Sequence, residues 1–188
     1  MVIPEDVIIS IAQSSVLAFR SANMQPPNLV PQAHCTHHVS SPSWIPKWIK
    51  PTNNRLKANS DANLQNWGMW GLGVIIRNED GMAMAAATWL SKGFHCALTA
   101  EAIVLLNTVK LARDCGFRHV EFESDNEKLV NLLKHKEHAN RLYVGLVVKE
   151  IILLLSQFDF CVFRHTHRLG NKVVHSLAQL AHSEPNRV

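Results

Sequence analysis

The chain has 188 residues, of which 47% are hydrophobic, so it can bury one sizeable core and leave a further segment outside it. Its 19 Lys and Arg residues against 15 Asp and Glu residues give a formal net charge of +4, which permits a polyanionic partner without requiring one. No apolar run is long enough to span a membrane, the first ten residues lack the positive charge of a secretory signal, and the four cysteines lack paired spacing. We therefore expect a soluble, intracellular protein.

The first 53 residues differ in composition from the rest of the chain. Apolar residues at helical spacing predict a short amphipathic helix over residues 4–20. Prolines among Ser, Asn and His residues predict an extended linker over residues 21–53. We therefore divide the chain into an N-terminal helix and Pro/Ser/His-rich linker over 1–53, one folded domain over 54–183 and a short tail over 184–188.

The folded domain has a strand-rich first half and a second half in which strands alternate with helices. In chain order, the predicted elements are strands over 55–63, 70–77 and 82–90, a helix over 99–114, a strand over 118–124, helices over 126–135 and 142–157, a strand over 158–165 and a helix over 171–183. The first three strands are expected to form an antiparallel meander, with a turn at Asn78–Gly81. The alternation that follows indicates parallel pairing, so we expect an α/β fold with a mixed sheet covered by helices.

Two carboxylates stand where a buried element is not expected to carry them. Glu101 shares one helical face with Leu105 and Val109, and this face ought to pack on the sheet. An ionised Glu at that position is costly unless a positive group meets it, although a helix start capped by Thr99 is a simpler reason for an acid there. Asp61 lies in the alternating strand LKANSDAN, where by itself it is a residue of the polar face or a turn former near the end of the strand.

A third carboxylate, Asp125, follows the strand HVEFES at the point where the strand becomes a helix. Ser124 and Glu127 form an S-x-x-E capping box around it, so Asp125 alone reads as an ordinary acid of a first helical turn. Topology changes this interpretation, because a strand, the start of a helix and the end of a neighbouring parallel strand can meet at one edge of a sheet. Three carboxylates held together repel one another, and divalent cations such as Mg²⁺ sustain such a cluster. Two such ions can cleave a phosphodiester.

Five sequence motifs occur in the order that is found in a known protein family. They are WIKPTNNRLKANSDAN, GLGVIIRNEDG, TAEA, VEFESD and RLGNKVVHSLAQLA, and together they cover about residues 48–183. In this order and spacing they resemble the type 1 ribonuclease H domain, specifically the branch found in plant non-LTR retroelements and their domesticated relatives. The resemblance implies a ribonuclease H-like fold: a five-stranded mixed sheet, three strands antiparallel and then two parallel, flanked by helices.

The resemblance also implies the site residues. It assigns metal binding to Asp61, Glu101 and Asp125, the same three acids that the residue pattern brings together, and it implies Mg²⁺ as the cofactor, with Mn²⁺ as the alternative. His165 matches a family histidine proposed to carry protons or to help the product leave. The candidates for contact with nucleic acid are Asn59, Asn63, Arg168 and Asn171.

Two positions depart from the family pattern. The family usually has a fourth acid four residues after an Asn in its last helix, whereas here Asn171 is followed by His175. A neutral imidazole is a poor ligand for Mg²⁺, so His175 as a metal ligand would weaken one site or favour Mn²⁺; alternatively, it only joins a polar stripe of that helix. Ala62 replaces the Gly that usually follows the first Asp, which restricts the approach of backbone to a ligand.

The expected function is endonucleolytic hydrolysis of the RNA strand of an RNA–DNA hybrid by two metal ions. The expected partner is therefore a hybrid or another nucleic acid, bound by a monomer without a membrane or a small-molecule cofactor. Two alternatives remain. In the first, suggested by His175 and Ala62, the protein is a catalytically weakened or inactive nucleic-acid-binding remnant of a retroelement. In the second, it is an interaction module that keeps only the fold. A lone G-x-G at Gly71 and Gly73 lacks the third glycine of a dinucleotide fingerprint, so nucleotide binding is rejected.

Overall fold

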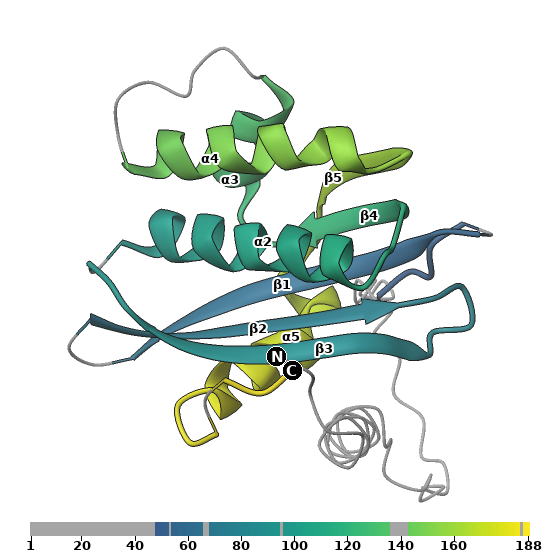
Figure 1. Ribbon diagram of the computed structural model, residues 1–188. Coiled ribbons are helices and arrows are strands. Elements are labelled where there is room, and N and C mark those ends of the chain that lie inside the picture. The colour runs from purple at the N-terminus through teal and green to yellow at the C-terminus, as the bar shows by residue number, and fades with distance from the viewer. Residues whose placement is uncertain (1–47, 53, 66–67, 95, 136–142, 185) are drawn as a thin grey trace, which may run out of the picture.

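A computed structural model describes residues 48–52, 54–65, 68–94, 96–135, 143–184 and 186–188 (Figure 1). The helix predicted over 4–20 and nearly all of the linker predicted over 21–53 lie outside these residues. The described helices and strands are β1 (Leu56–Gln65), β2 (Met69–Arg77), β3 (Ala83–Lys92), α2 (Ala97–Asp114), β4 (His119–Ser124), α3 (Glu127–Lys134), α4 (Tyr143–Leu154), β5 (Phe160–His165) and α5 (Lys172–Leu180). Among the described residues, no helix is both long enough and apolar enough to cross a membrane.

The strands form one five-stranded mixed sheet with the order β3-β2-β1-β4-β5. β1 pairs with β2 and β2 pairs with β3 in antiparallel orientation, whereas β1 with β4 and β4 with β5 are parallel. The predicted meander, the parallel half and the predicted fold class are thus confirmed. The reason is the sequence itself: only residues 66–68 separate β1 from β2 and only residues 78–82 separate β2 from β3, whereas helices separate β4 and β5 from their predecessors and leave room for parallel crossovers.

Helices cover both faces of the sheet. α2, α3 and α4 lie on one side and α5 lies on the other (Figure 1). The larger core joins the sheet to α2 and α4 and includes Ile76, Phe122, Leu105 and Ile151, whereas Ile75 packs toward α5 in a separate cluster. β2 is therefore buried on both faces, which explains its nearly continuous apolar sequence.

Close packing of α5 on β2 requires the glycines of the G-x-G pair. A Cβ atom added to Gly73 would lie 2.5 Å from the backbone nitrogen of Ala178 and 2.7 Å from the carbonyl oxygen of Val174. A Cβ atom on Gly71 would overlap the carbonyl oxygen of Ala178. The motif that resembles part of a nucleotide-binding fingerprint therefore has a packing role, because it lets a helix backbone approach a strand backbone directly.

Replacing Gly73 by Ala is expected to destabilise the domain by about 1–3 kcal/mol, because α5 must move away from β2 to make room for the methyl group. Urea unfolding, followed by the tryptophan fluorescence and the far-UV circular dichroism, measures this loss. An unchanged midpoint would contradict the direct contact between Gly73 and the α5 backbone.

The observed helix starts differ from the predicted ones. The residue before α2 is Cys96, which makes no side-chain cap, and the predicted cap Thr99 lies inside the helix. Asn126 caps α3, with its Oδ1 atom accepting a hydrogen bond from the Leu129 nitrogen at 3.1 Å. The capping box predicted from Ser124 is therefore wrong. The position of the cap at Asn126 matters for the site, because Asp125 then precedes α3 and belongs to the connection between β4 and α3.

Segments outside the predicted domain limits also pack on the domain. The side chain of Trp48 donates a hydrogen bond from its indole nitrogen to Asn59, so the folded unit includes residues before the predicted boundary at residue 54. At the other end, the nitrogen of Thr88 in β3 donates to the carbonyl oxygen of Arg187 at 2.7 Å, so the predicted tail contacts the sheet.

Two helices end earlier than the predicted ranges 142–157 and 171–183. α4 stops at Leu154 and continues as one turn of 3₁₀ helix, and α5 stops at Leu180.

Candidate active site

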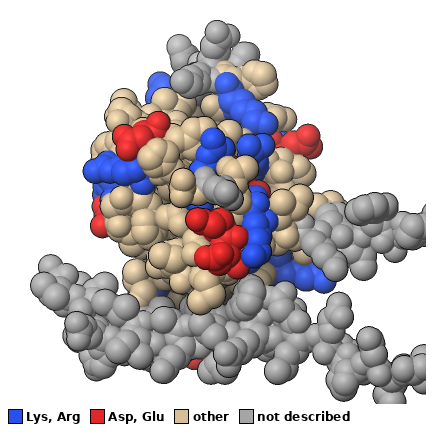
Figure 2. Space-filling model, turned by 90° about the vertical axis from the view of Figure 1, so that its right-hand side faces the viewer, with Lys and Arg blue, Asp and Glu red and all other residues tan. Residues whose placement is uncertain are grey.

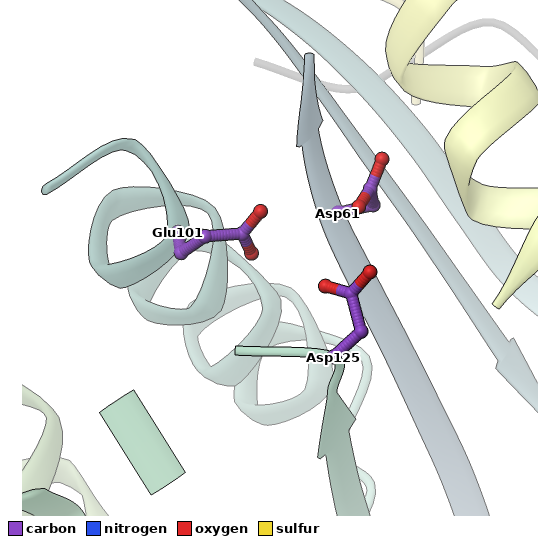
Figure 3. Close-up of side chains that lie close together, drawn as sticks. All are labelled: Asp61, Glu101 and Asp125. Carbon is purple, nitrogen blue, oxygen red and sulfur yellow. The ribbon is translucent and has the colours of Figure 1, made fainter. Parts of the chain in front are cut away.

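The three predicted carboxylates lie together. Asp61 extends from β1, Glu101 from the first turns of α2 and Asp125 from the residue after β4, and all three point toward one another (Figure 3). One carboxylate oxygen from each residue lies within 4.8 Å of the others. The residues are up to 64 positions apart in the chain, so the fold alone brings them together.

The sheet register explains the placement of the two aspartates. β1 and β4 run in parallel, and their last paired residues are Ser60 and Ser124. Asp61, which stays in β1 opposite Gly73, and Asp125, which follows the end of β4, are the next residues along the two chains, so they lie side by side. The start of α2 passes over the same place and adds Glu101 from above the sheet (Figure 3).

Burial makes the site electrostatically costly without a cation. Asp61 and Glu101 are only 5% and 6% exposed. Burial raises the pKa of Glu101 well above its usual range, and the charges of Asp61 and Asp125 raise it further, while a hydrogen bond from the Ala62 nitrogen and the charge of Arg168 oppose the rise. Burial also raises the pKa of Asp61, against a hydrogen bond with His175. Bringing these acids together therefore opposes folding of the cation-free protein above the ordinary carboxyl pKa.

The donor set fits a hard divalent cation. The Oε1 atom of Glu101 accepts the hydrogen bond from the Ala62 nitrogen at 3.2 Å, but its buried Oε2 atom has no hydrogen-bond partner among the described residues. A buried carboxylate oxygen without a partner costs free energy that a bound cation would recover. Three carboxylates with no sulfur ligand suit Mg²⁺ or Mn²⁺.

His175 lies at one side of this cluster. Its Nδ1 atom is 2.9 Å from the Oδ2 atom of Asp61, and its Nε2 atom is 3.3 Å from the amide nitrogen of Gln179. If the amide of Gln179 donates to Nε2, the ring proton resides on Nδ1 and is donated to Asp61. The polar stripe that the sequence predicts through His175, Gln179 and His182 thus faces β1, since His182, just after α5, also contacts the carbonyl oxygen of Asn63 at 3.2 Å. Sequence reasoning identified this stripe but missed Gln179 as the partner of His175.

The remaining candidates fall into two groups, on the surface and in the interior. His165 and Arg168 are exposed; His165 contacts the carbonyl oxygen of Asp125 through Nε2 at 3.2 Å, and the charge of Arg168 reaches both buried acids. Asn63 is partly exposed at the end of β1.

Two of the predicted nucleic-acid contacts are buried. Asn171 is 2% exposed and donates from its amide to the carbonyl oxygen of Ser60 at 2.9 Å. Asn59 is 0% exposed, and both ends of its amide are bonded to protein groups. The prediction that Asn59 contacts nucleic acid is therefore wrong, because that half of the polar face is covered. Strand alternation identified the face but not what lies over it.

Solved structures with similar folds include ribonucleases H and a foamy viral protease-reverse transcriptase. The ribonuclease H1 of the halophilic archaeon Halobacterium salinarum NRC-1 has a TM-score of 0.64 and 22% identity, over 70% of this chain and 99% of that chain. LC11-RNase H1 in complex with an RNA/DNA hybrid has a TM-score of 0.59 and 18% identity, over 65% and 92%. A foamy viral protease-reverse transcriptase in complex with an RNA/DNA hybrid has a TM-score of 0.50 and 13% identity, over 83% of this chain and 23% of that chain.

These identities are low, so the structural likeness shows a ribonuclease H-like fold and no more. A search of curated protein sequences found no match. The model of the family described as reverse transcriptase-like matches residues 59–181, a span that begins within β1, runs past the end of α5 and contains all three clustered carboxylates. The chain belongs to this reverse transcriptase-like family.

Proposed function

We propose that this chain cleaves the RNA strand of an RNA–DNA hybrid endonucleolytically, as a type 1 ribonuclease H that uses two divalent metal ions. The observation that carries the proposal is the cluster of Asp61, Glu101 and Asp125, with carboxylate oxygens within 4.8 Å of one another. The unpartnered Oε2 atom of Glu101 supports a cation at this place. Relatives in fold that were solved with RNA/DNA hybrids support the choice of substrate.

The three acids would hold Mg²⁺, or Mn²⁺, through their carboxylate oxygens. When bound, a pair of such ions supplies an activated water and stabilises the leaving oxygen of a phosphodiester. The protein groups around them fix orientation: the Ala62 nitrogen holds one oxygen of Glu101, and His175 holds one oxygen of Asp61. His165, exposed and in contact with the carbonyl oxygen of Asp125, is placed to exchange protons with solvent or to help the product leave.

Binding of the hybrid would not depend on its sequence. Basic side chains adjoin acidic ones on the face seen in Figure 2. Arg168 is exposed and its charge acts on Asp61 and Glu101, so its guanidinium could contact a phosphate bound there, and Asn63 is partly exposed near the end of β1. Asn171 would act from the interior, by holding the backbone of β1 at Ser60 next to Asp61. We further propose that the chain acts as a monomer without a small-molecule cofactor and that it derives from the plant non-LTR retroelement branch.

The test is cleavage of a hybrid labelled on its RNA strand. We expect internal cuts in the RNA with Mg²⁺ or Mn²⁺, no cuts with EDTA, and no cuts in the DNA strand or in duplex DNA of the same sequence. The second candidate, a weakened or inactive nucleic-acid-binding remnant, is favoured by the position of His175 on Asp61. Hybrid binding without cleavage would support that remnant, and absence of both would indicate a module that keeps only the fold.

The metal preference gives a prediction for His175. Changing His175 to Asp is expected to raise cleavage with Mg²⁺ relative to cleavage with Mn²⁺ by about tenfold, because a carboxylate is a better ligand than imidazole for Mg²⁺. Steady-state rates with each ion measure the ratio. His175→Asn is the matched control, because it removes the imidazole without adding a charge. An unchanged ratio in His175→Asp would remove His175 from the set of metal ligands.

A further inference from the structure

A second group of charged side chains is buried on the same face of the sheet as Asp61. It consists of Lys57, Asn59, Arg77, Glu121 and Glu123, which we name the charged network. Each of these residues is at most 7% exposed. The register places them side by side, because Lys57 pairs with both Arg77 and Glu121, and Asn59 pairs with Glu123. Buried ion pairs rarely stabilise more than apolar packing of the same volume, so a network of this size suggests a role in specifying geometry.

Asn59 is the centre of the charged network. Its Nδ2 atom donates to the Oε2 atom of Glu123 at 2.9 Å, and its Oδ1 atom accepts from Arg77 at 2.8 Å and from the indole nitrogen of Trp48 at 2.9 Å. The other oxygen of Glu123 lies 2.7 Å from the ammonium group of Lys57. The side-chain bond between Asn59 and Glu123 therefore bridges β1 and β4, and its two ends are fixed from several directions.

This bridge lies directly beneath the carboxylate cluster. Asn59 precedes Asp61 by two residues on β1, and Glu123 precedes Asp125 by two residues on β4. Backbone pairing between the two strands ends at Ser60 and Ser124, so it does not include either aspartate. The Asn59–Glu123 hydrogen bond is thus a cross-strand link next to the two acids whose spacing determines how they share a cation.

Trp48 and Ile49, which precede β1, contact the charged network from outside the sheet. The guanidinium carbon of Arg77 lies 3.7 Å from the centre of the Trp48 ring, and the ammonium group of Lys57 donates to the carbonyl oxygen of Ile49 at 2.7 Å. Burial lowers the pKa of Arg77 to about 10, while the charge of Glu123 opposes this fall, so Arg77 stays protonated at neutral pH. Contacts to Trp48 and Ile49 therefore keep the bridge buried beside a charged guanidinium group.

We infer that Asn59 and Glu123 are positioning residues, which set the spacing between Asp61 and Asp125 and thereby the affinity of the carboxylate cluster for a divalent cation. The inference rests on the proposed function, since it concerns the same cluster. Neither residue contacts the cation or the substrate; both act through the strands that carry the acids. Removing a group that orients a metal ligand without touching the metal typically lowers metal affinity or activity by about 10- to 100-fold.

The experiment measures Mn²⁺ binding to the full chain without substrate, by electron paramagnetic resonance titration. Asn59→Leu removes the bridge with a side chain of similar size and leaves the net charge unchanged. We expect it to weaken Mn²⁺ binding about tenfold and to lower kcat for the hybrid while KM stays within about twofold. The double variant Lys110→Met with Glu150→Gln also leaves the net charge unchanged but removes an exposed ion pair between α2 and α4, so it is expected to bind Mn²⁺ within about threefold of the wild type.

Val147→Ala serves as the control for lost stability, because it deletes buried methyl groups in α4, in the core on the other side of the sheet. Equal Mn²⁺ affinity in Asn59→Leu and Val147→Ala would overturn the inference. If Asn59→Leu does not fold, Trp48→Phe, which removes the indole donor to Asn59 and keeps a smaller aromatic ring beside Arg77, is expected to weaken Mn²⁺ binding by about threefold, and an unchanged affinity would overturn the inference. If the wild-type protein binds Mn²⁺ but cuts no hybrid, the proposed function is refuted, and the Mn²⁺ affinities of the variants still test the positioning role of Asn59 and Glu123. If the wild-type protein does not bind Mn²⁺, both the proposed function and the positioning role are refuted.

Discussion

Replacing Glu101 by Gln is expected to reduce cleavage by at least about a thousandfold and, at the same time, to stabilise the metal-free protein. The amide oxygen can keep the hydrogen bond from the Ala62 nitrogen, so the local structure has no reason to change. The variant loses the charge that binds the cation, which accounts for the lost activity. It also loses the repulsion from Asp61 and Asp125 and the burial of a charge, which accounts for the gain in stability.

The gain should depend on pH in a defined direction. Burial raises the pKa of Glu101 in the folded protein above its ordinary value of 4.5. Below that value Glu101 is protonated in both states, so the wild type and Glu101→Gln should differ little. As pH rises above it, the unfolded chain loses the proton more readily than the folded protein does, and the wild type loses stability until the folded group has ionised. The advantage of Glu101→Gln should therefore grow between about pH 4.5 and neutrality.

Thermal unfolding in EDTA over that range measures the difference between Glu101→Gln and the wild type. Asp80→Asn, in the exposed turn between β2 and β3, removes a carboxylate outside the cluster and should show no such growth with pH. A Tm for Glu101→Gln that stays equal to that of the wild type at neutral pH would show that the cluster carries no electrostatic strain. Adding Mn²⁺ should raise the Tm of the wild type and leave that of Glu101→Gln nearly unchanged, because ligands stabilise only the state that binds them.

Changing Asp125 to Asn should also abolish cleavage, by at least about a thousandfold, while the hybrid remains bound. Asp125 is half-buried and lies outside α3, so the isosteric amide should be tolerated without a change in fold. An amide oxygen carries no net charge and is a weaker ligand for a hard divalent cation than a carboxylate is. Cleavage kinetics and hybrid binding, measured separately on the same labelled hybrid, distinguish loss of chemistry from loss of affinity.

Asp159→Asn provides the matched control for Asp125→Asn, because Asp159 is an exposed acid just before β5. It should cut the hybrid at the wild-type rate. Substantial metal-dependent cleavage by Asp125→Asn would mean that Asp61 and Glu101 are sufficient, and the proposed three-carboxylate site would then be wrong.

The sequence predicted the carboxylate cluster because its position depends on topology alone. Parallel strands end at one edge of a sheet, so an acid at the end of β4 and an acid in β1 can be brought together without knowledge of any side-chain contact. The same reasoning failed for Asn59, since its environment comes from Trp48, Arg77 and Glu123. A strand pattern shows which residues share a face, but long-range partners determine whether that face is open.

The helix starts show a second limit of sequence reasoning. Ser124, Asp125 and Asn126 all have side chains that can cap a helix, and local preference alone does not choose among them. The register of β4 with β1 extends the strand to Ser124, so the cap falls on Asn126. Asp125 is left between strand and helix, and its carboxylate is free to point at the cluster.

The pairing of Arg187 with β3 bears on how the protein behaves at high concentration. β3 lies at one edge of the sheet, and Met82 just before it and Met84 within it are 63% and 50% exposed. An outer strand offers unpaired backbone groups that another chain can join, and exposed methionines add apolar area to such an association. Arg187 occupies the backbone nitrogen of Thr88 and interrupts that row. Shortening the chain before Arg187 would expose the row again and favour self-association through β3.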